Sequence, residues 1–219
     1  MKIQWIGHSC FLITDDSGGT LLTDPYDTQA YVGSLLYRQV DLSPDVVTVS
    51  HAHADHAGVG RLGGSPRVLD ATGENDINGF KVRGVATFHD NVRGAQRGGN
   101  TVFVIRADGL TAAHLGDLGH ELSDRQLEEI GPLDVALMPV GGFFTIDAAG
   151  ATRVWQQLGP PAVTIPMHFR NDKCHFSIEG VAPFLEGKLH VETPGVSEFM
   201  ATEENLSGGP KIVVLDPAY

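Results

Sequence analysis

The chain contains few cysteines and no long apolar run. Only Cys10 and Cys174 occur among 219 residues, which is too few for a disulfide scaffold and is typical of a protein with free thiols. No segment approaches the roughly 18 consecutive apolar residues that a membrane span needs. The N-terminal segment reaches His8 before the apolar core of a secretory leader develops. We therefore expect a cytoplasmic protein that has no association with membranes.

Basic side chains are also scarce. The sequence has 15 Lys and Arg residues against 27 Asp and Glu residues, a formal net charge of −12. This excess of negative charge disfavours an extended phosphate-binding surface, so no nucleic-acid partner is expected. No Ser/Pro-rich segment or long run of like charge divides the chain, and its length fits a single domain, residues 1–219. The oligomeric state stays open, and a homo-oligomer is one of the alternatives.

Short apolar runs rich in β-branched residues predict strands along the whole chain. The run 2–14 is expected to form one strand, which a glycine-containing turn joins to a second strand at 20–25. Asp108-Gly109, between runs 101–107 and 110–117, predicts a tight hairpin. Further strands are expected at 45–50, 66–71, 80–89, 134–140, 161–168 and 211–216.

Helices are expected between the later strands. The segment 122–132 carries a capping-box pattern, with Ser123 three residues before Gln126. A second helix is expected to begin near Asp147 and to end at Gly159. Weaker helical patterns occur at 57–62, which contains glycines, and at 177–187, which Pro183 interrupts. This order of elements predicts sheets with both antiparallel and parallel pairing, covered by helices.

The segment 48–58, TVSHAHADHAG, concentrates potential metal ligands. Four of its residues have side chains that bind first-row metals, namely His51, His53, Asp55 and His56. His89, Asp117 and His168 follow other predicted strands, and groups at strand ends can converge on one edge of a sheet. A lone histidine at a strand end is usually a hydrogen-bonded surface or core residue, but seven such groups indicate a metal site. Seven ligands are also more than one ion needs, which favours two ions.

The pattern His51-Ala-His53-Ala-Asp55-His56, followed by His89, Asp117 and His168, resembles the signature of the metallo-β-lactamase superfamily. The segments GHSCFLI, HLGDLGH and IPMHF are similar to the branch that includes ascorbate-6-phosphate lactonase and many metal-dependent hydrolases. The resemblance implies an α/β fold, a four-layer αββα sandwich of two mixed sheets with helices on the outer faces. It also implies that His51, His53 and His89 hold one ion, that Asp55, His56 and His168 hold the other, and that Asp117 bridges the two.

The implied mechanism is hydrolysis by a metal-bridged hydroxide, with Asp55 as the group that orients the water or accepts its proton. Asp24 matches an early aspartate that braces the ligand loop by fixing a histidine tautomer, although an Asp-Pro pair is also a common turn. The metals are expected to be two divalent ions, with zinc favoured and manganese or iron as alternatives.

Several residues give a weaker signal. His120 is a candidate general acid or substrate contact, or else a cap of the helix that follows it. Arg97 and Asn100, in the loop after His89, and Lys173, after His168, are candidates for binding an anionic substrate. Two further histidines stay undecided between the site and a structural role, His8 and His114.

The sequence therefore predicts a dinuclear metal-dependent hydrolase that cleaves an ester, lactone or phosphoester bond in a small, anionic substrate. One alternative is a nuclease or phosphodiesterase of the same superfamily, which the acidic composition disfavours. Another is a metal-binding regulatory protein without turnover. The substrate depends on loops and pocket shape, which the sequence does not reveal.

Overall fold

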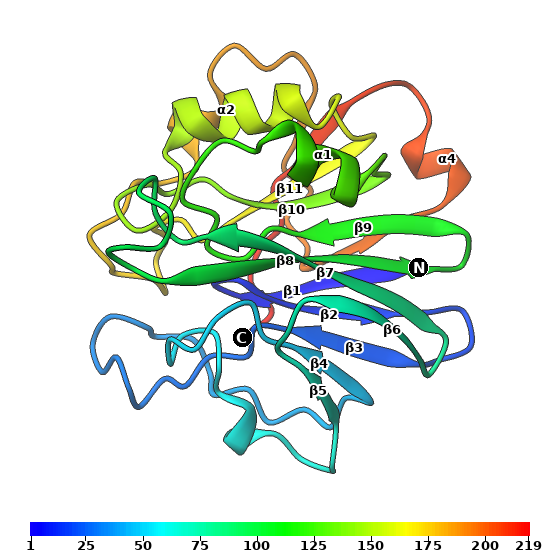
Figure 1. The fold of residues 1–219 in the computed structure, drawn as a ribbon, viewed down its shortest axis with the longest axis vertical. Coiled ribbons are helices and arrows are strands. Elements are labelled where there is room, and N and C mark those ends of the chain that lie inside the picture. Colours follow the sequence, from blue (N-terminus) through cyan, green and yellow to red (C-terminus); the bar gives the residue numbers. More distant parts are fainter.

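The computed structural model describes residues 1–219 as two β-sheets packed face to face (Figure 1). The smaller sheet has six strands in the order β13-β1-β2-β3-β4-β5. Pairing is antiparallel from β13 to β3 and parallel from β3 to β5. Its strands are β1 (Lys2–Gly7), β2 (Cys10–Thr14), β3 (Thr20–Thr23), β4 (Val46–Thr48), β5 (Arg67–Leu69) and β13 (Glu198–Met200).

The larger sheet has eight strands in the order β12-β14-β11-β10-β9-β8-β7-β6. The strands from β12 to β9 are parallel, and β9, β8, β7 and β6 pair antiparallel. Both sheets are therefore mixed, as predicted. The strands are β6 (Gly73–Ile77), β7 (Phe80–Phe88), β8 (Gly99–Ala107), β9 (Leu110–His114), β10 (Val135–Pro139), β11 (Val163–Met167), β12 (Val191–Glu192) and β14 (Lys211–Val213).

The predictions for the hairpin at Asp108-Gly109 and for the N-terminal strand had different outcomes. Asp108 and Gly109 connect β8 to β9 with φ values of 54° and 75°, the left-handed conformation expected for a two-residue hairpin turn. The prediction of one strand over 2–14 is wrong, because the chain reverses at His8, which has a φ of 53°. The preceding Gly7 has a φ of 152°, and a Cβ there would lie 2.6 Å from the ring of Tyr37.

The helices lie mainly where the sequence predicts them. Helix α1 (Asp124–Ile130) begins after Ser123, whose capping box with Gln126 is formed on both sides. Helix α2 (Ala148–Gln157) is capped by the side chain of Asp147. The segment 57–62 forms only the short 3₁₀ helix η1 (Val59–Arg61). Pro183 does not interrupt a helix but lies in the first turn of α3 (Ala182–Leu185), where proline is tolerated. The last helix, α4 (Glu203–Leu206), was not predicted.

Helices cover the outer face of one sheet, and a loop covers the outer face of the other. Helices α1 and α2 cover the outer face of the eight-stranded sheet at the top of Figure 1, and their buried side chains join the main apolar core. No α-helix covers the six-stranded sheet. Its outer face is covered by the loop between β3 and β4, whose Leu35, Tyr37 and Val40 pack with Ile6 and Leu22 in a second, smaller core. The predicted two-sheet fold is thus confirmed, with a loop layer on one side.

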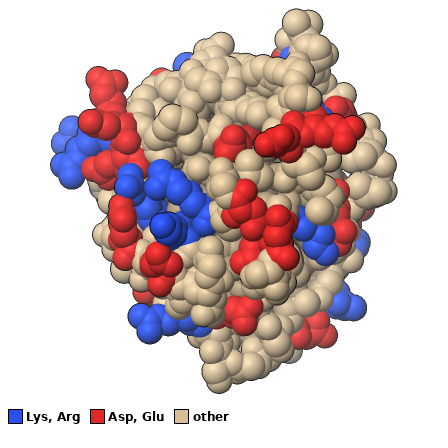
Figure 2. Space-filling model, turned by 90° about the vertical axis from the view of Figure 1, so that its right-hand side faces the viewer, with Lys and Arg blue, Asp and Glu red and all other residues tan.

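The direction of the strands determines where loops gather. Strands β1, β3 and β4 of one sheet and β7, β9 and β11 of the other all end at the same edge of the sandwich, on the left in Figure 1. The opposite face, seen in Figure 2, presents basic side chains interspersed with acidic ones. None of the helices combines the length and the apolar composition that a membrane span requires.

Candidate metal centre

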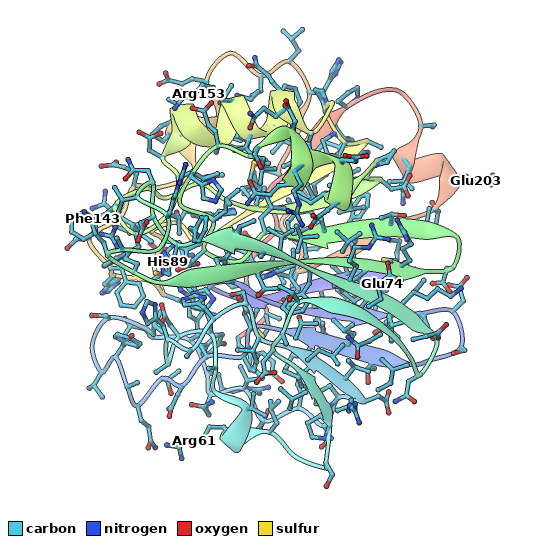
Figure 3. All side chains as sticks on the ribbon, in the orientation of Figure 1. Arg61, Glu74, His89, Phe143, Arg153 and Glu203 are labelled. Atoms are coloured by element: carbon cyan, nitrogen blue, oxygen red, sulfur yellow. The ribbon has the colours of Figure 1, made fainter.

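The seven predicted ligands converge at the left-hand edge of the sandwich, near the labelled His89 in Figure 3. Six of these ligands, together with His8, fall into two groups, within each of which all donor atoms lie within 4.8 Å of one another: His51, His53 and His89 form one, and His8, Asp55, His56 and His168 form the other. This division matches the two half-sites expected from the sequence and adds His8 to one of them. A third such group, Asp24 with His51 and His56, overlaps both.

Asp117 lies between the two groups. Its Oδ2 atom is 3.1 Å from Nε2 of His89, in the first group, and 3.3 Å from Nε2 of His168, in the second. Its Oδ1 atom is 3.2 Å from Nε2 of His56. A single carboxylate therefore reaches donor atoms of both groups, as a bridging ligand would.

Unpaired polar atoms at the centre fit a bound cation. Nε2 of His56 and Oδ1 of Asp117 are buried without a hydrogen-bond partner, although such groups are normally paired. Burial lowers the pKa of His56, but the carboxylates of Asp117 and Asp55 outweigh it and raise that pKa well above its ordinary value. The centre thus attracts positive charge, and a metal ion competes with a proton for the same place.

The ring nitrogen of His56 that points away from the centre is held by Asp24. Oδ2 of Asp24 lies 2.7 Å from Nδ1 of His56, so the ring donates to the carboxylate and directs its free Nε2 toward the centre. Asp24 is fully buried and also accepts from the backbone N–H of Ser50 at 2.7 Å. The hydroxyl of Ser50 donates to the same carboxylate and lies 3.0 Å from Nδ1 of His51. Asp24 therefore braces the ligand loop rather than forming only a turn.

His8 is the site residue that the sequence left undecided. The turn between β1 and β2 projects its ring into the centre, where Nε2 lies 3.2 Å from Oδ2 of Asp55. Its ring centroid is 4.3 Å from that of His168, and its Nδ1 is 3.9 Å from Sγ of Cys174. The pair Gly7-His8 within an otherwise apolar strand pattern was the available signal, since glycine marks a break in a strand.

Burial keeps several of these rings uncharged. It lowers the pKa of His51 to about 3, with a further contribution from His56. It lowers the pKa of His8 to about 4, together with the nearby His168. Both rings are therefore neutral at pH 7, which is the form that coordinates a metal or accepts a hydrogen bond.

A pocket of about 260 Å³ opens directly onto the centre. Besides five of the predicted ligands, four residues line it: Tyr31, Arg97, Phe144 and Phe176. Arg97 was predicted as a substrate contact, and the structure places it in this pocket. The aromatic residues come from three loops and were not predicted, because isolated aromatic residues in loops carry no periodic pattern.

The position of Arg97 depends on Asp90. The carboxylate of Asp90 accepts hydrogen bonds from the backbone N–H groups of Val92 and Gly94, at 2.9 Å and 2.8 Å. It also accepts from Gln96 and from Arg97 itself, at 2.9 Å and 2.8 Å. One buried side chain therefore folds the loop after His89 and presents Arg97 to the pocket.

Three predicted contacts are not placed in the pocket. Asn100 is buried and uses its side chain to hold Thr87, the carbonyl of Leu115 and the backbone N–H of Asp117, so it positions the Asp117 loop instead of binding substrate. Lys173 donates to the carbonyl of the last residue, Tyr219. The ring of His120 accepts from the backbone N–H of Phe88 and donates to the carbonyl of Glu121, which leaves no free nitrogen for acid catalysis.

The remaining undecided histidine is structural. His114 is fully buried at the end of β9, and its Nε2 lies 2.8 Å from the carbonyl oxygen of Ser9. Its Nδ1 accepts from the backbone N–H of Gly116 at 3.3 Å. Both nitrogens are thus occupied within the fold.

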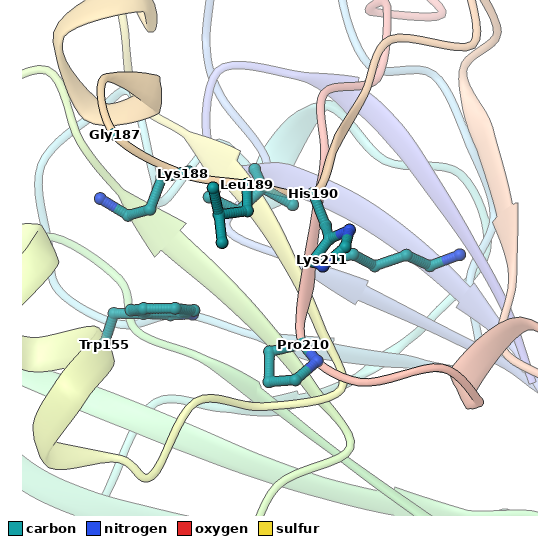
Figure 4. A pocket seen from close by; sticks show the side chains of 8 residues that line it. Trp155, Gly187, Lys188, Leu189, His190, Pro210 and Lys211 are labelled. Carbon is teal, nitrogen blue, oxygen red and sulfur yellow. The ribbon is translucent and has the colours of Figure 1, made fainter.

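A second cavity, of about 310 Å³, lies away from the centre beside Trp155 and Pro210 (Figure 4). Its lining contains no carboxylate. Lys188 donates to Thr152 and to the carbonyl of Phe184, and Lys211 pairs with Glu192 at 3.1 Å. This cavity therefore lacks the donor set that distinguishes the pocket at the sheet edge.

Two mixed sheets with a centre of histidines and aspartates at one edge define the architecture of a metallo-hydrolase. The model of the β-lactamase superfamily domain matches residues 2–168, and the chain belongs to the metallo-β-lactamase superfamily of metal-dependent hydrolases.

The chain is similar to solved and curated members of this superfamily. It is 37% identical to a candidate Zn-dependent hydrolase of the metallo-β-lactamase superfamily from Thermotoga maritima, with a TM-score of 0.80 over 98% of this chain and 97% of the other. It is 31% identical to a metal-dependent hydrolase of Methanosphaerula palustris over 77% of this chain and 84% of the relative. An isothiocyanate hydrolase from Delia radicum gut bacteria has a TM-score of 0.69 at 14% identity, covering 99% and 97% of the two chains, which indicates a shared fold.

Proposed function

We propose that the protein binds two divalent metal ions and hydrolyses an ester, lactone or phosphoester bond in a small, anionic substrate. The observation that carries the proposal is Asp117, whose two oxygens face donor groups on both sides within 3.3 Å. A protein that needed one ion would not require a second complete set of ligands on the other side of this carboxylate.

In this proposal His51, His53 and His89 hold one ion, and Asp55, His56 and His168 hold the other. Zinc suits this mixture of imidazole and carboxylate, and manganese or iron are the alternatives that the same ligands accept. When bound, the two metal ions would supply a water nucleophile that is deprotonated near neutral pH. They would also supply positive charge that stabilises the oxygen of the electrophile.

The chain's own residues contribute position and proton handling. Asp55 lines the pocket and is held by His8, so its carboxylate is oriented to accept a proton from the attacking water. The hydroxyl of Tyr31 lies close enough to Asp55 that burial and this carboxylate raise the tyrosine's pKa. Arg97 faces the same pocket and supplies the positive charge for an anionic group of the substrate.

The proposal is tested with a double substitution, His53→Ala with Asp55→Ala, assayed on a panel of esters, lactones and phosphoesters. Each half-site loses a ligand, so we expect loss of hydrolysis and of metal while the circular dichroism spectrum stays that of a folded protein. The exposed His175 and His190 provide a matched control, since His175→Ala with His190→Ala removes histidine away from the pocket lining. Retained turnover in the double variant contradicts the proposal. A metal-loaded wild-type protein that is inert on the whole panel supports a regulatory metal-binding protein instead.

The proposed cellular setting is the cytoplasm, with a small molecule as the partner. A salt-sensitive affinity for RNA, measured with the metal-loaded protein, would support the nuclease alternative.

A further inference from the structure

The pocket over the metal centre has an aromatic wall, formed by Tyr31, Phe144 and Phe176. We propose that the substrate carries a planar aromatic group, which this wall binds, and a single carboxylate, which Arg97 binds. The inference rests on the proposed function, because it assigns the substrate class of the same pocket.

The rings of the wall are arranged edge to face. The centroids of Tyr31 and Phe176 are 5.3 Å apart with their planes at 86°, and those of Phe144 and Phe176 are 6.0 Å apart at 72°. Phe176 also lies 5.6 Å from the ring of His8, so the wall extends down to the metal centre. Aromatic rings prefer offset-stacked or edge-to-face neighbours, and a further ring placed in this pocket meets both kinds of surface.

The aromatic wall is an apolar surface that the rest of the protein covers only in part. All three rings are half-buried, in a protein whose other large apolar side chains are mostly in the core. Their chain neighbours Val32 and Phe143 are 84% and 67% exposed. Figure 3 shows Phe143 at the same edge of the molecule as His89. A contiguous apolar surface beside a pocket is typical of a binding site, because a ligand that covers it removes it from water.

Arg97 supplies the cationic side chain of the pocket. It is the only Lys or Arg residue in the lining. Its guanidinium carbon is 5.7 Å from the centroid of the Phe144 ring, and its side chain has no ion pair within the protein. One guanidinium pairs with a carboxylate through two parallel hydrogen bonds.

The size of the pocket agrees with this class. A volume of about 260 Å³ is below the usual range for drug-sized ligands, so it accommodates one ring with a short acidic chain rather than a polycyclic or oligomeric substrate.

The test measures equilibrium binding of three probes to the metal-loaded protein by titration calorimetry. The probes are 3-phenylpropionate, its saturated counterpart 3-cyclohexylpropionate, and 3-phenylpropan-1-ol, which keeps the ring and lacks the carboxylate. Each favourable aromatic pair contributes binding free energy beyond that of the buried apolar area alone. We therefore expect 3-phenylpropionate to bind about fivefold more tightly than 3-cyclohexylpropionate. 3-Phenylpropan-1-ol is expected to bind more weakly than 3-phenylpropionate, because it offers Arg97 no carboxylate.

Two variants assign the effect to residues. Phe176→Leu should reduce the ratio of the affinity for 3-phenylpropionate to that for 3-cyclohexylpropionate to near one. Phe199→Leu, in β13, should leave this affinity ratio unchanged. Arg97→Met should weaken both carboxylates about tenfold without changing their ratio, since it removes a charge-assisted hydrogen bond and no ring. Arg93→Met, in the same loop but outside the lining of this pocket, is the matched control.

The inference is overturned if the saturated probe or 3-phenylpropan-1-ol binds as tightly as 3-phenylpropionate, if no probe binds, or if Phe176→Leu leaves the ratio of phenyl to cyclohexyl affinity intact. These outcomes are separate from a failure of the proposed function. A protein that holds two ions and hydrolyses the panel but shows no aromatic preference contradicts only the substrate class. A protein that binds no metal contradicts the proposed function itself.

Discussion

Single residues behind the ligands decide how well the centre is organised. Asp24 is fully buried and bonds to His56 and Ser50, so it determines which nitrogen of His56 faces the centre. Asn100 positions Asp117 in a similar way, because its side-chain oxygen accepts a hydrogen bond of 2.9 Å from the backbone N–H of Asp117. Neither residue needs to touch substrate to matter for the site.

The substitution Asp24→Asn should weaken metal binding while the protein remains folded. The amide keeps the shape of the carboxylate but loses the charge that holds Nδ1–H of His56, and loss of such a partner typically costs about 10–100-fold in metal affinity. Competition against a zinc-binding dye measures this affinity. Asp172→Asn, at an exposed position, serves as the control, and equal affinities in the two variants would refute the role assigned to Asp24.

The substitution His8→Asn should weaken one ion selectively. Asparagine tolerates the left-handed φ of 53° at this turn, but it is too short to keep the 3.2 Å contact with Asp55. We expect the ion held by Asp55, His56 and His168 to bind about tenfold more weakly and the other ion to be unaffected. A two-site metal titration distinguishes the ions, and an equal loss at both sites would contradict the assignment of His8 to one half-site.

At the scale of elements, local sequence patterns predicted turns and caps reliably. The Asp108-Gly109 turn and the Ser123 capping box form as expected, because a few adjacent residues determine them. The reversal at His8 was not predicted: Gly7 was its one local signal, and the close approach of Tyr37 to Gly7 comes from a distant loop. The burial of Asn100 and the bond of Lys173 to the C-terminal residue likewise depend on tertiary contacts.

The turn between β2 and β3 provides a pH-dependent test of local stability. Desolvation raises the pKa of Asp15, but hydrogen bonds from Ser17 and from the backbone of Gly19 lower it more, so its net pKa is below the ordinary value. The ionised form therefore stabilises the folded state above the ordinary pKa of aspartate, and this stabilisation is lost as pH falls through the folded-state pKa. Asp15→Asn should lower the free energy of unfolding by about 1 kcal/mol at pH 7.

The difference in the free energy of unfolding between wild type and Asp15→Asn should be constant near neutral pH and shrink as pH falls from about 4 to about 2, because over this range the carboxylate becomes protonated, first in the unfolded protein and then in the folded one. Urea unfolding of both metal-free proteins across this range measures it. A difference that stays constant or grows toward low pH would show that the charge of Asp15 does not support the turn.

At the scale of the whole molecule, the metal centre joins the two sheets. His51, His53, Asp55 and His56 follow β4 of the six-stranded sheet, whereas His89, Asp117 and His168 follow strands of the eight-stranded sheet. The sequence predicted these seven residues because ligand chemistry and strand ends are visible along the chain, whereas it left His8 undecided. It did not predict the aromatic wall, which forms only when three separate loops come together.

Removal of metal should therefore lower the thermal stability of the entire domain. An ion that binds only the folded state at about 100 times its Kd contributes about 2.7 kcal/mol, which corresponds to roughly 5–10 °C for a domain of this size. Differential scanning calorimetry with and without a chelator measures the shift. The variant with both His53→Ala and Asp55→Ala should be insensitive to the chelator, and an equal shift in that variant would place the stabilising metal elsewhere.

The central claim is that the protein holds a dinuclear metal centre. Its most direct test is the metal content of the purified protein, measured by elemental mass spectrometry after equilibration with zinc and removal of free metal. We predict two ions per chain in the wild type and a lower content when Asp117, the carboxylate between the two groups, is replaced by alanine. One bound ion per chain at saturating zinc, or none, would contradict a dinuclear centre.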